Sequence, residues 1–580
     1  MTEPTAPPET LAEFSSTSRR APATSGGASA TSGGGRRIEI YDTTLRDGTQ
    51  GVGVSLTLTD KLAITQLLDE LGFDYVEGGY PLSNPKDVAY FEEVQKLDLK
   101  HTRVCAFGMT RRKGVPPEDD PGMRALVGSG APVITIVGKT WDLHVDEVLR
   151  IGRDENLAMI RDSVAFCRGA AHVEDVFYDA EHFFDGYRAN PAYARQTLQA
   201  AIDGGASRLV LCDTNGGSMP GWITQVMSEL REHLAVDADA SPASLPGVPG
   251  VAIHCHNDGG VAAANSQAAV EAGAVQVQGT INGIGERCGN VDLLTVIANL
   301  RLKLGYDCLL PGDAAMSRLG ELSRRVYELA AMEPSPGQPY VGGNAFAHKG
   351  GMHVHAVQRI AHSYEHVPPE SLGNQRRVLV SELSGRSNIA AKLGEKFGDA
   401  ATPDVQKRLL ERVQDLEHRG YQFEHADGSL ELLMIDALGR RPAFWTLEHY
   451  RCVILGVRGR RPTTEAIVKL RVGDAGEHRV AGGDGPVNAL DAALRKALRD
   501  HYPEIDALHL TDYAVRVVNP TAESAAKVRV TAEFEARGDD GRLRRFGTIG
   551  VNENIVDASW QALVDAMQVH LIERRGGVAG

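Results

Sequence analysis

Arg46 and Asp47 stand where a strand-like segment turns into a polar loop, and they are the first residues with clear chemical potential. They belong to IEIYDTTLRDGTQG, residues 38–51, which opens with alternating bulky side chains and closes in a polar turn. Enzymes with α/β folds place reactive side chains at the carboxyl ends of their strands. We therefore expect the rest of the chain to supply partners for this arginine and this carboxylate.

A second group of reactive side chains ends a later strand-like segment, in the sequence HCHND at residues 254–258. Side chains alternate along a strand, so His254 and His256 point to the same face. Two inward imidazoles at a strand end could bind a divalent metal, or they could be hydrogen-bonded histidines of a polar barrel. Asp47, at the corresponding end of the first strand, favours the metal site.

The glycine-containing segment NGIGERCGN, residues 282–290, follows the last strand-like segment. Its glycines miss the dinucleotide-binding pattern G-x-G-x-x-G by one position, and it lacks the strand–helix context of that pattern. A loop whose backbone approaches a ligand fits better, with Glu286 and Asn290 facing that ligand. The candidate metal ligands are then Asp47, His254, His256 and Asn290. Such a shell of nitrogen and oxygen suits Mg, Mn, Co or Zn and leaves positions for a chelating substrate.

Other polar side chains lie in positions that could serve a reaction. Glu181 and Thr214 lie at the ends of two further strand-like segments and could bind a substrate or make structural hydrogen bonds. The basic run at residues 111–113 could meet phosphates or form a solvated loop. The segment FAHKGGMHVHA, residues 346–356, places three histidines in a loop with glycines. Histidine suits proton transfer near neutral pH, although the spacing leaves a second metal site open.

These residues need a fold that brings many strand ends together. Strand-like segments alternate with amphipathic helical segments, such as residues 60–72, where Gly72 stands at the expected helix stop. The strand-like segments are residues 38–44, 74–81, 103–109, 133–140, 175–184, 208–215, 251–258 and 275–283. Eight strand–helix repeats over roughly 250 residues indicate an α/β fold, the closed (β/α)8 TIM barrel, with an open doubly wound sheet as the alternative.

Composition and pattern divide the chain into four regions. Residues 1–35 are rich in Ser, Thr, Ala, Gly and Pro and are expected to be a disordered tail. Residues 36–310 are expected to form the catalytic barrel, and residues 311–440 a helical linker. Residues 441–575 show three strands and a helix, twice, which predicts an α+β regulatory or dimerisation domain. Each half exposes an apolar helix face, so we expect the halves to pack together.

The overall charge and the cysteines limit the class of protein. The 580-residue chain has a net charge of -15, which argues against a general nucleic-acid binder, so an anionic ligand would need a local basic pocket. The seven cysteines are odd in number and form no CxxC pair, which indicates free thiols in a reducing cytoplasm. No apolar run approaches the ~20 residues that a membrane span needs.

Taken together, the motifs resemble the DRE-TIM metallolyase family, in its Claisen-condensing acyltransferase branch. The motifs that carry the resemblance are DTTLRDG, HCHND, GERCGN and FAHKGGMH. The C-terminal double repeat is similar to the regulatory domain of 2-isopropylmalate synthases and citramalate synthases. The segments GGYPLSNPKD (78–87) and GNQRRVLVSELSGRSN (373–388) look most like the citramalate-forming members, from whose pattern Tyr80, Leu82 and His355 depart.

The resemblance implies a Claisen condensation of acetyl-CoA with pyruvate that gives (R)-citramalate and CoA and feeds isoleucine biosynthesis. The alternative is the condensation of acetyl-CoA with 2-oxoisovalerate, the 2-isopropylmalate synthase reaction of leucine biosynthesis. A third alternative, a non-catalytic amino-acid sensor on the same scaffold, is disfavoured by the intact set of polar strand-end residues.

The resemblance also implies roles for particular residues. Arg46 would polarise the keto oxygen, Glu181 would assist the reaction, and His353 would be the catalytic histidine, which can act from the partner subunit of a homodimer. Tyr364 would lie near that histidine. The substrate-binding residues implied in this way are Arg46, Thr214, Tyr80 and Asn84. A divalent metal and acetyl-CoA are the implied cofactor and co-substrate, and isoleucine or leucine the implied effector of the C-terminal domain.

Overall fold

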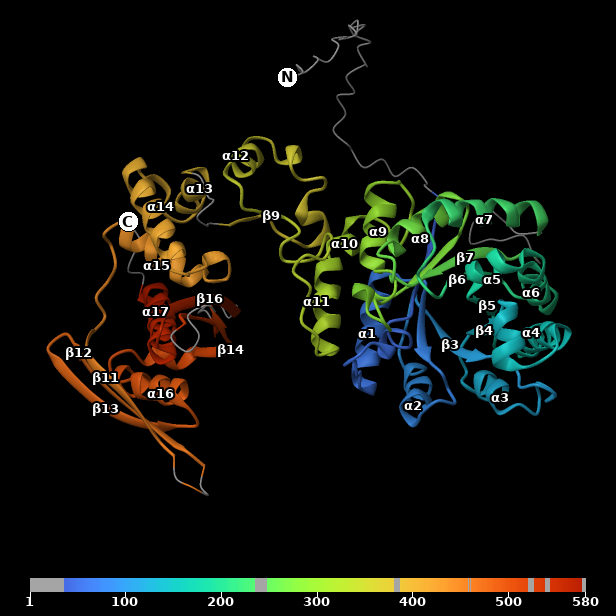
Figure 1. Cartoon of the computed structure of the whole chain (residues 1–580), viewed down its shortest axis with the longest axis horizontal. Coiled ribbons are helices and arrows are strands. Elements are labelled where there is room, and N and C mark those ends of the chain that lie inside the picture. The colour runs from blue at the N-terminus through green and yellow to red at the C-terminus, as the bar shows by residue number, and fades with distance from the viewer. Residues whose placement is uncertain are drawn as a thin grey trace, which may run out of the picture.

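The computed structural model describes residues 36–234, 248–379, 386–456, 458, 461–519, 526–537 and 543–575. The expected tail at residues 1–35 lies outside the described residues. Along the chain, a barrel comes first, a helical region follows it, and a body built on two small sheets comes last (Figure 1). Within the described residues, no helix combines the length and the apolar character needed to cross a membrane.

The eight-stranded parallel barrel predicted from the sequence is confirmed. Its strands pair in chain order and β8 closes on β1, with Glu39 opposite Gln276 and Asp42 opposite Gly279. The strands are β1 (Glu39–Asp42), β2 (Tyr75–Gly79), β3 (Arg103–Met109), β4 (Val133–Lys139), β5 (Asp175–Glu181), β6 (Arg208–Asp213), β7 (Gly250–Cys255) and β8 (Gln276–Gly279).

Helices surround these strands, as Figure 1 shows, and bury their apolar faces against the outside of the barrel. They are α1 (Leu58–Leu71), α2 (Pro85–Val94), α3 (Pro121–Gly128), α4 (Arg153–Arg168), α5 (Phe183–Ala189), α6 (Pro191–Gly204), α7 (Pro220–His233), α8 (Ala262–Glu271) and α9 (Leu293–Leu302). Helix α1 illustrates the local signals. It begins with a capping box between Thr57 and Asp60 and ends at Gly72, whose left-handed φ of 79° suits glycine.

The interior of the barrel is filled with side chains, so that no pore runs through it. Tyr41, Tyr75 and Phe177 pack against one another with ring centroids 5.1 to 6.1 Å apart. At the amino-terminal end of the strands, Arg208 donates through Nε and Nη2 to the carboxylate of Glu39 at 3.1 and 3.0 Å. Because this end is closed by packing and a buried ion pair, the opposite end of the strands is left for ligands.

The region after the barrel is helical, as the sequence predicts. Its helices are α10 (Asp313–Met316), α11 (Leu319–Leu329), α12 (Gly351–Arg359), α13 (Arg386–Phe397), α14 (Pro403–His418) and α15 (Asp427–Ala437). Two short parallel strands, β9 (Ala347–His348) and β10 (Arg377–Val378), lie among them. Helix α14 buries Leu409, Val413 and Leu416 on one face, the spacing that a 3.6-residue repeat requires.

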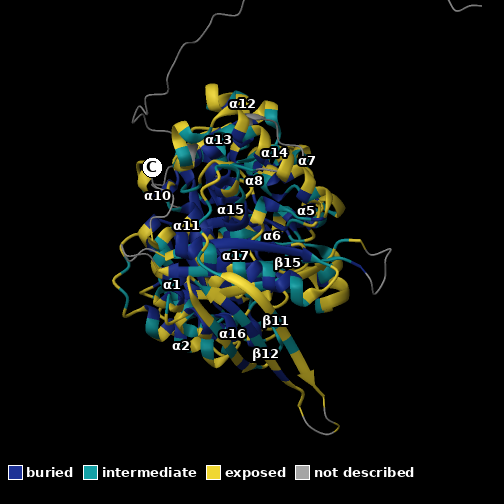
Figure 2. Cartoon of the chain, turned by 90° about the vertical axis from the view of Figure 1, so that its left-hand side faces the viewer, coloured by how far each residue is buried: buried dark blue, intermediate teal, exposed yellow. Residues whose placement is uncertain are grey.

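The C-terminal body contains the predicted repeat of three strands and one helix. The first unit is β11 (Thr446–Leu455), β12 (Thr463–Val472), β13 (Ala475–Gly483) and α16 (Pro486–Leu498). The second unit is β14 (Leu508–Val517), β15 (Val528–Arg537), β16 (Leu543–Asn552) and α17 (Ile555–Arg575). Apolar residues of α16 and α17 share one core, so the halves bury each other's apolar faces. Strand β11 is mostly exposed (Figure 2).

Candidate active site

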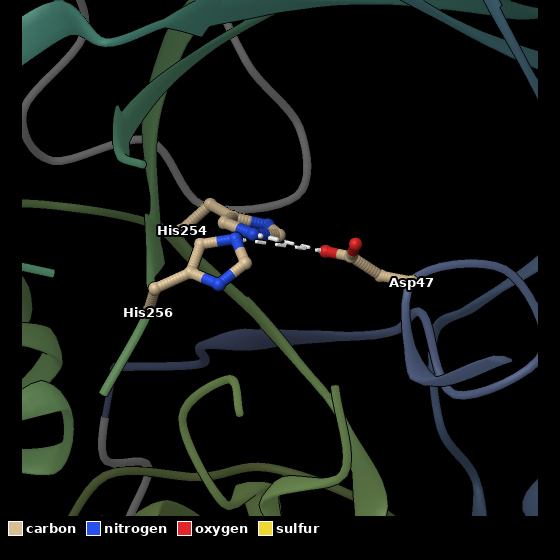
Figure 3. Close-up of side chains that lie close together, drawn as sticks. All are labelled: Asp47, His254 and His256. Atoms are coloured by element: carbon tan, nitrogen blue, oxygen red, sulfur yellow. Dashed lines mark ion pairs between the residues drawn. The ribbon is translucent and has the colours of Figure 1, made fainter. Parts of the chain in front are cut away.

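Three side chains that could hold a metal converge at the carboxyl end of the barrel. Asp47 comes from the loop after β1, His254 from β7 and His256 from the residues that follow it. Their ligand atoms all lie within 4.8 Å of one another, and all three residues are buried. Figure 3 shows the two imidazoles and the carboxylate turned toward one another. The Nε2 atoms of His254 and His256 lie 3.3 and 4.0 Å from Asp47 Oδ2. The structure therefore brings His254 and His256 together on one face, beside Asp47, as the HCHND spacing predicts.

Asn290 completes this group from the loop after β8. Its Nδ2 donates to Asp47 Oδ2 at 2.8 Å and lies 3.4 Å from His254 Nε2. Its Oδ1 is buried and has no hydrogen-bond partner among the described residues, and the same holds for His256 Nδ1. A buried carboxylate and two buried imidazoles with their ligand atoms this close together fit a divalent metal. Asn290 would ligate through Oδ1, which requires its amide to turn so that Oδ1 replaces Nδ2 beside Asp47. The residues present thus fit a divalent ion.

The electrostatics of the group also suit a cation. Burial would raise the pKa of Asp47, but the charge of Arg46 and the hydrogen bond and charge of His254 hold this pKa well below its usual range. Burial and the charge of His254 lower the pKa of His256 to about 4, so its imidazole is neutral at pH 7. His254 Nδ1 lies 3.1 Å from Gln278 Oε1, which orients the ring with Nε2 toward Asp47.

Arg46 is fixed from several sides at the edge of this group. Its Nε donates to Glu77 Oε2 at 2.5 Å, and its Nη1 lies 3.0 Å from Asp47 Oδ1. Its guanidinium lies 3.9 Å from the centre of the Phe107 ring. Glu77 is fully buried and also accepts hydrogen bonds from the hydroxyls of Tyr41 and Thr43. The guanidinium is therefore pre-positioned, with its unpaired N–H groups left for a ligand oxygen.

A cavity of about 320 Å³ brings most of the predicted residues together. Its lining includes Arg46, Asp47, Glu181, Thr214, His254 and His256. Lys139 from the end of β4 forms an ion pair with Glu181. Thr214 Oγ1 accepts the backbone N–H of His182 at 2.8 Å, which leaves its hydroxyl proton for a ligand. The cavity thus offers cationic and hydroxyl donors next to a metal-binding group.

The other predicted site residues lie outside this cavity. Tyr80 lines a neighbouring cavity, and the side chain of Asn84 caps α2 by accepting the N–H of Asp87. His353 on α12 and Tyr364 stack on each other with ring centroids 4.4 Å apart, and neither of them lines the cavity that holds Asp47. The structure therefore places this aromatic pair on the helical region, separately from the metal-binding group.

Three residues of the site were not predicted from the sequence. All three lie on barrel strands. Glu77 forms an ion pair with Arg46, Lys139 forms one with Glu181, and Asp179 lines the cavity that holds Asp47. Burial and the charge of Glu77 raise the pKa of Asp179 to about 7. The available signal was a charged side chain within an apolar strand-like run, such as Glu77 in DYVEGGYP, because a buried charge needs a partner.

Comparison with known proteins agrees with this geometry. The family model described as HMGL-like matches residues 37–326, the homocitrate synthase post-HMGL domain-like model matches 340–420, and the LeuA allosteric (dimerisation) domain matches 424–571. The (R)-citramalate synthase of Geobacter sulfurreducens is 49% identical over 92% of this chain and 97% of its own. That of Aquifex aeolicus is 46% identical over 93% and 98%. A probable 2-isopropylmalate synthase of Methanopyrus kandleri is 34% identical over 91% and 97%.

The barrel, its polar cavity and the matched family models define an HMGL-like condensing enzyme with a LeuA-type C-terminal domain. Within this class, the (R)-citramalate synthases match the chain along almost its whole length with 41 to 49% identity. The chain belongs to the (R)-citramalate synthase family, among the acyltransferases that convert the acyl group to alkyl on transfer.

Proposed function

We propose that this chain condenses acetyl-CoA with pyruvate to give (R)-citramalate and CoA, a reaction that feeds isoleucine biosynthesis. The observation that carries the proposal is the position of Arg46 beside Asp47, His254 and His256 in one cavity. The names of the relatives at 46 to 49% identity support the choice of product. The weaker match to a 2-isopropylmalate synthase, at 34%, keeps 2-oxoisovalerate as the alternative acceptor.

The proposed metal ligands are Asp47, His254, His256 and Asn290. A divalent ion there, one of Mg, Mn, Co or Zn, would act as a Lewis acid toward the keto oxygen of the bound 2-oxo acid. Arg46 donates hydrogen bonds to the same oxygen and stabilises the negative charge that forms on it. Thr214 donates its hydroxyl proton to the carboxylate of the acid, and Glu181, held by Lys139, lies beside the reacting atoms.

The reaction then needs a base. His353 removes a proton from the acetyl methyl group of acetyl-CoA, with Tyr364 stacked against it. The resulting carbon nucleophile attacks the keto carbon, and water hydrolyses the thioester, which releases CoA and leaves the product as a dicarboxylic acid. Since the pair does not line the cavity of its own chain, we propose that it acts on the cavity of the partner subunit in a homodimer.

We further propose a division of the chain into three functional regions. Residues 36–310 carry out catalysis, residues 311–440 form a helical linker, and residues 441–575 serve regulation and dimerisation. The match to a domain described as allosteric and dimerising supports this assignment. The effector is isoleucine, or leucine if the acceptor is 2-oxoisovalerate. The enzyme is expected in the cytoplasm, where its free thiols stay reduced.

A thiol-release assay tests the reaction. The purified protein, with a divalent metal and acetyl-CoA, is given pyruvate, 2-oxoisovalerate and other 2-oxo acids in parallel. We expect the highest kcat/KM with pyruvate and loss of activity on chelation that added metal restores. Preference for 2-oxoisovalerate would replace citramalate by isopropylmalate as the product, and no CoA release with any acid would contradict the enzymatic proposal.

A further inference from the structure

Thr214, the residue that follows β6, is held on two sides by residues with an uncommon backbone conformation. Its Oγ1 accepts the backbone N–H of His182 at 2.8 Å, and its carbonyl oxygen accepts a hydrogen bond from Arg287 Nη2 at 2.7 Å. His182 and Arg287 have φ angles of 53° and 56°, in the left-handed region that residues other than glycine rarely adopt. Such backbones persist only where the surroundings hold them, and they cluster at functional sites.

The peptide group between Glu181 and His182 is bonded at both of its polar atoms. Thr140, the residue after β4, donates its hydroxyl to the carbonyl of Glu181 at 2.5 Å, while the N–H of His182 donates to Thr214. β5 ends at Glu181 and α5 begins at Phe183, so the chain turns from strand to helix at His182 alone. A residue that cannot adopt a positive φ would therefore have to move this N–H or the start of α5.

The ring of His182 is anchored by contacts that lead back to the same threonine. It packs edge-on against the ring of His144, with ring centroids 4.6 Å apart. Its Nδ1 lies 3.4 Å from Asp185 Oδ2, which also accepts a hydrogen bond from Asn215 Nδ2 at 2.9 Å. Because Asn215 is the residue after Thr214, the backbone and the ring of His182 both fix the end of β6.

We propose that His182 is a positioning residue for the acceptor substrate and acts through Thr214. Its N–H occupies a lone pair of the threonine hydroxyl, so the hydroxyl proton is directed to the carboxylate of the bound 2-oxo acid. A donor that is fixed in advance loses little freedom when the acid binds, which strengthens binding. The inference rests on the proposed function, because it takes the 2-oxo acid as the ligand of Thr214.

A double-mutant cycle tests whether His182 acts through Thr214. H182V places a β-branched residue where φ must be positive, and T214V removes the hydroxyl. We expect each single variant to raise the KM for pyruvate roughly tenfold, the scale of one hydrogen bond to a charged group. The double variant should be no worse than T214V, since the hydroxyl that His182 positions is already absent. The KM for acetyl-CoA should stay near the wild-type value throughout.

Two further variants separate this role from general backbone strain. His182→Asn should return the KM for pyruvate to near the wild-type value, because asparagine adopts the left-handed region more readily than most residues. The matched control is Ala331→Val, at an exposed residue after α11 with a φ of 52°. It introduces the same strain outside the site and should leave this KM unchanged.

An unchanged KM for pyruvate in H182V, or effects of H182V and T214V that multiply in the double variant, would overturn the inference. If H182V does not fold, Asp185→Ala takes its place in the cycle. This variant releases the ring of His182 without changing the backbone at that residue. It should raise the KM for pyruvate in the wild-type background and have no further effect beside T214V.

Binding of the acid alone separates the inference from the proposed reaction. Isothermal titration of pyruvate, with Mn²⁺ present and no acetyl-CoA, needs no turnover. We expect weaker binding to H182V and T214V, and the same affinity for T214V and the double variant. This pattern in an enzyme that forms no product would refute the reaction and keep the positioning role. Equal affinity of the wild type and H182V would reject that role, and failure of the wild type to bind either pyruvate or 2-oxoisovalerate would reject both.

Discussion

Asp47 is the central carboxylate of the candidate metal site. It accepts a hydrogen bond from Asn290 and lies between two imidazoles and a guanidinium. We predict that Asp47→Asn lowers turnover at least about 100-fold, the scale on which loss of one preorganised electrostatic group acts. Metal retained after gel filtration should fall in parallel. The exposed Asp98→Asn serves as the control, and near-normal turnover of Asp47→Asn with bound metal would refute the ligand assignment.

Asp179 gives a prediction for stability at the same scale. Burial and the charge of Glu77 raise its folded-state pKa to about 7, above its ordinary value of 3.8. The native state therefore holds a proton that the unfolded state releases, and this residue lowers stability as pH rises from about 4 to 7. Asp179→Asn should raise Tm more at pH 8 than at pH 5 in protein freed of metal by a chelator. An equal shift at both pH values would contradict this.

The sequence predicted several site residues, but not the side chains that these residues contact. The HCHND spacing identified His254 and His256, because alternation along a strand fixes which side chains share a face. It could not identify Glu77 as the partner of Arg46, since 31 residues and a helix separate them. The same applies to Lys61, whose burial on α1 depends on Asp87 from the next helix.

At the scale of elements, the strands and the two C-terminal units followed from periodicity, whereas the surroundings of α12 did not. Three histidines in its segment looked like one reactive loop, but their contacts differ. His348 Nε2 lies 3.1 Å from Glu365 Oε1, and Glu365 also accepts two hydrogen bonds from Arg376, at 2.6 and 2.5 Å. His353 instead stacks on Tyr364. The segment was expected to be a loop, but Gly351–Arg359 form helix α12, which carries His353. Spacing alone cannot separate a structural histidine from an exposed one.

This ion network predicts a role in holding α12 in place. Glu365 is buried, and it directly follows Tyr364, so it ties the stacked pair to β9 and β10. Glu365→Gln should lower local stability by about 1–3 kcal/mol, because Arg376 loses its charged partner. Hydrogen–deuterium exchange should be faster in α12 than in the wild type and unchanged in α1. Unchanged exchange in α12 would mean that the network does not position this helix.

For the whole molecule, the separation of His353 from the cavity leads to a complementation test. In a symmetric dimer, a subunit with a disabled cavity can still supply its histidine to the other subunit. Neither Asp47→Ala nor His353→Ala should be active alone. When both are unfolded and refolded together, or co-expressed, a measurable fraction of wild-type CoA release should return. If both mixtures are inactive although mass spectrometry shows that mixed dimers have formed, the histidine acts in the site of its own chain.

The fixed guanidinium of Arg46 has a consequence for which metabolites the enzyme ignores. A guanidinium carries only donors and a permanent positive charge, and here Glu77, Asp47 and Phe107 leave it no freedom to turn away. A 2-amino acid would bring an ammonium group to the position of the keto oxygen, where cation would face cation. Transamination of a 2-oxo acid thus removes it from the substrates of this enzyme. Once the oxo group has become an amine, the molecule no longer binds, whatever its side chain.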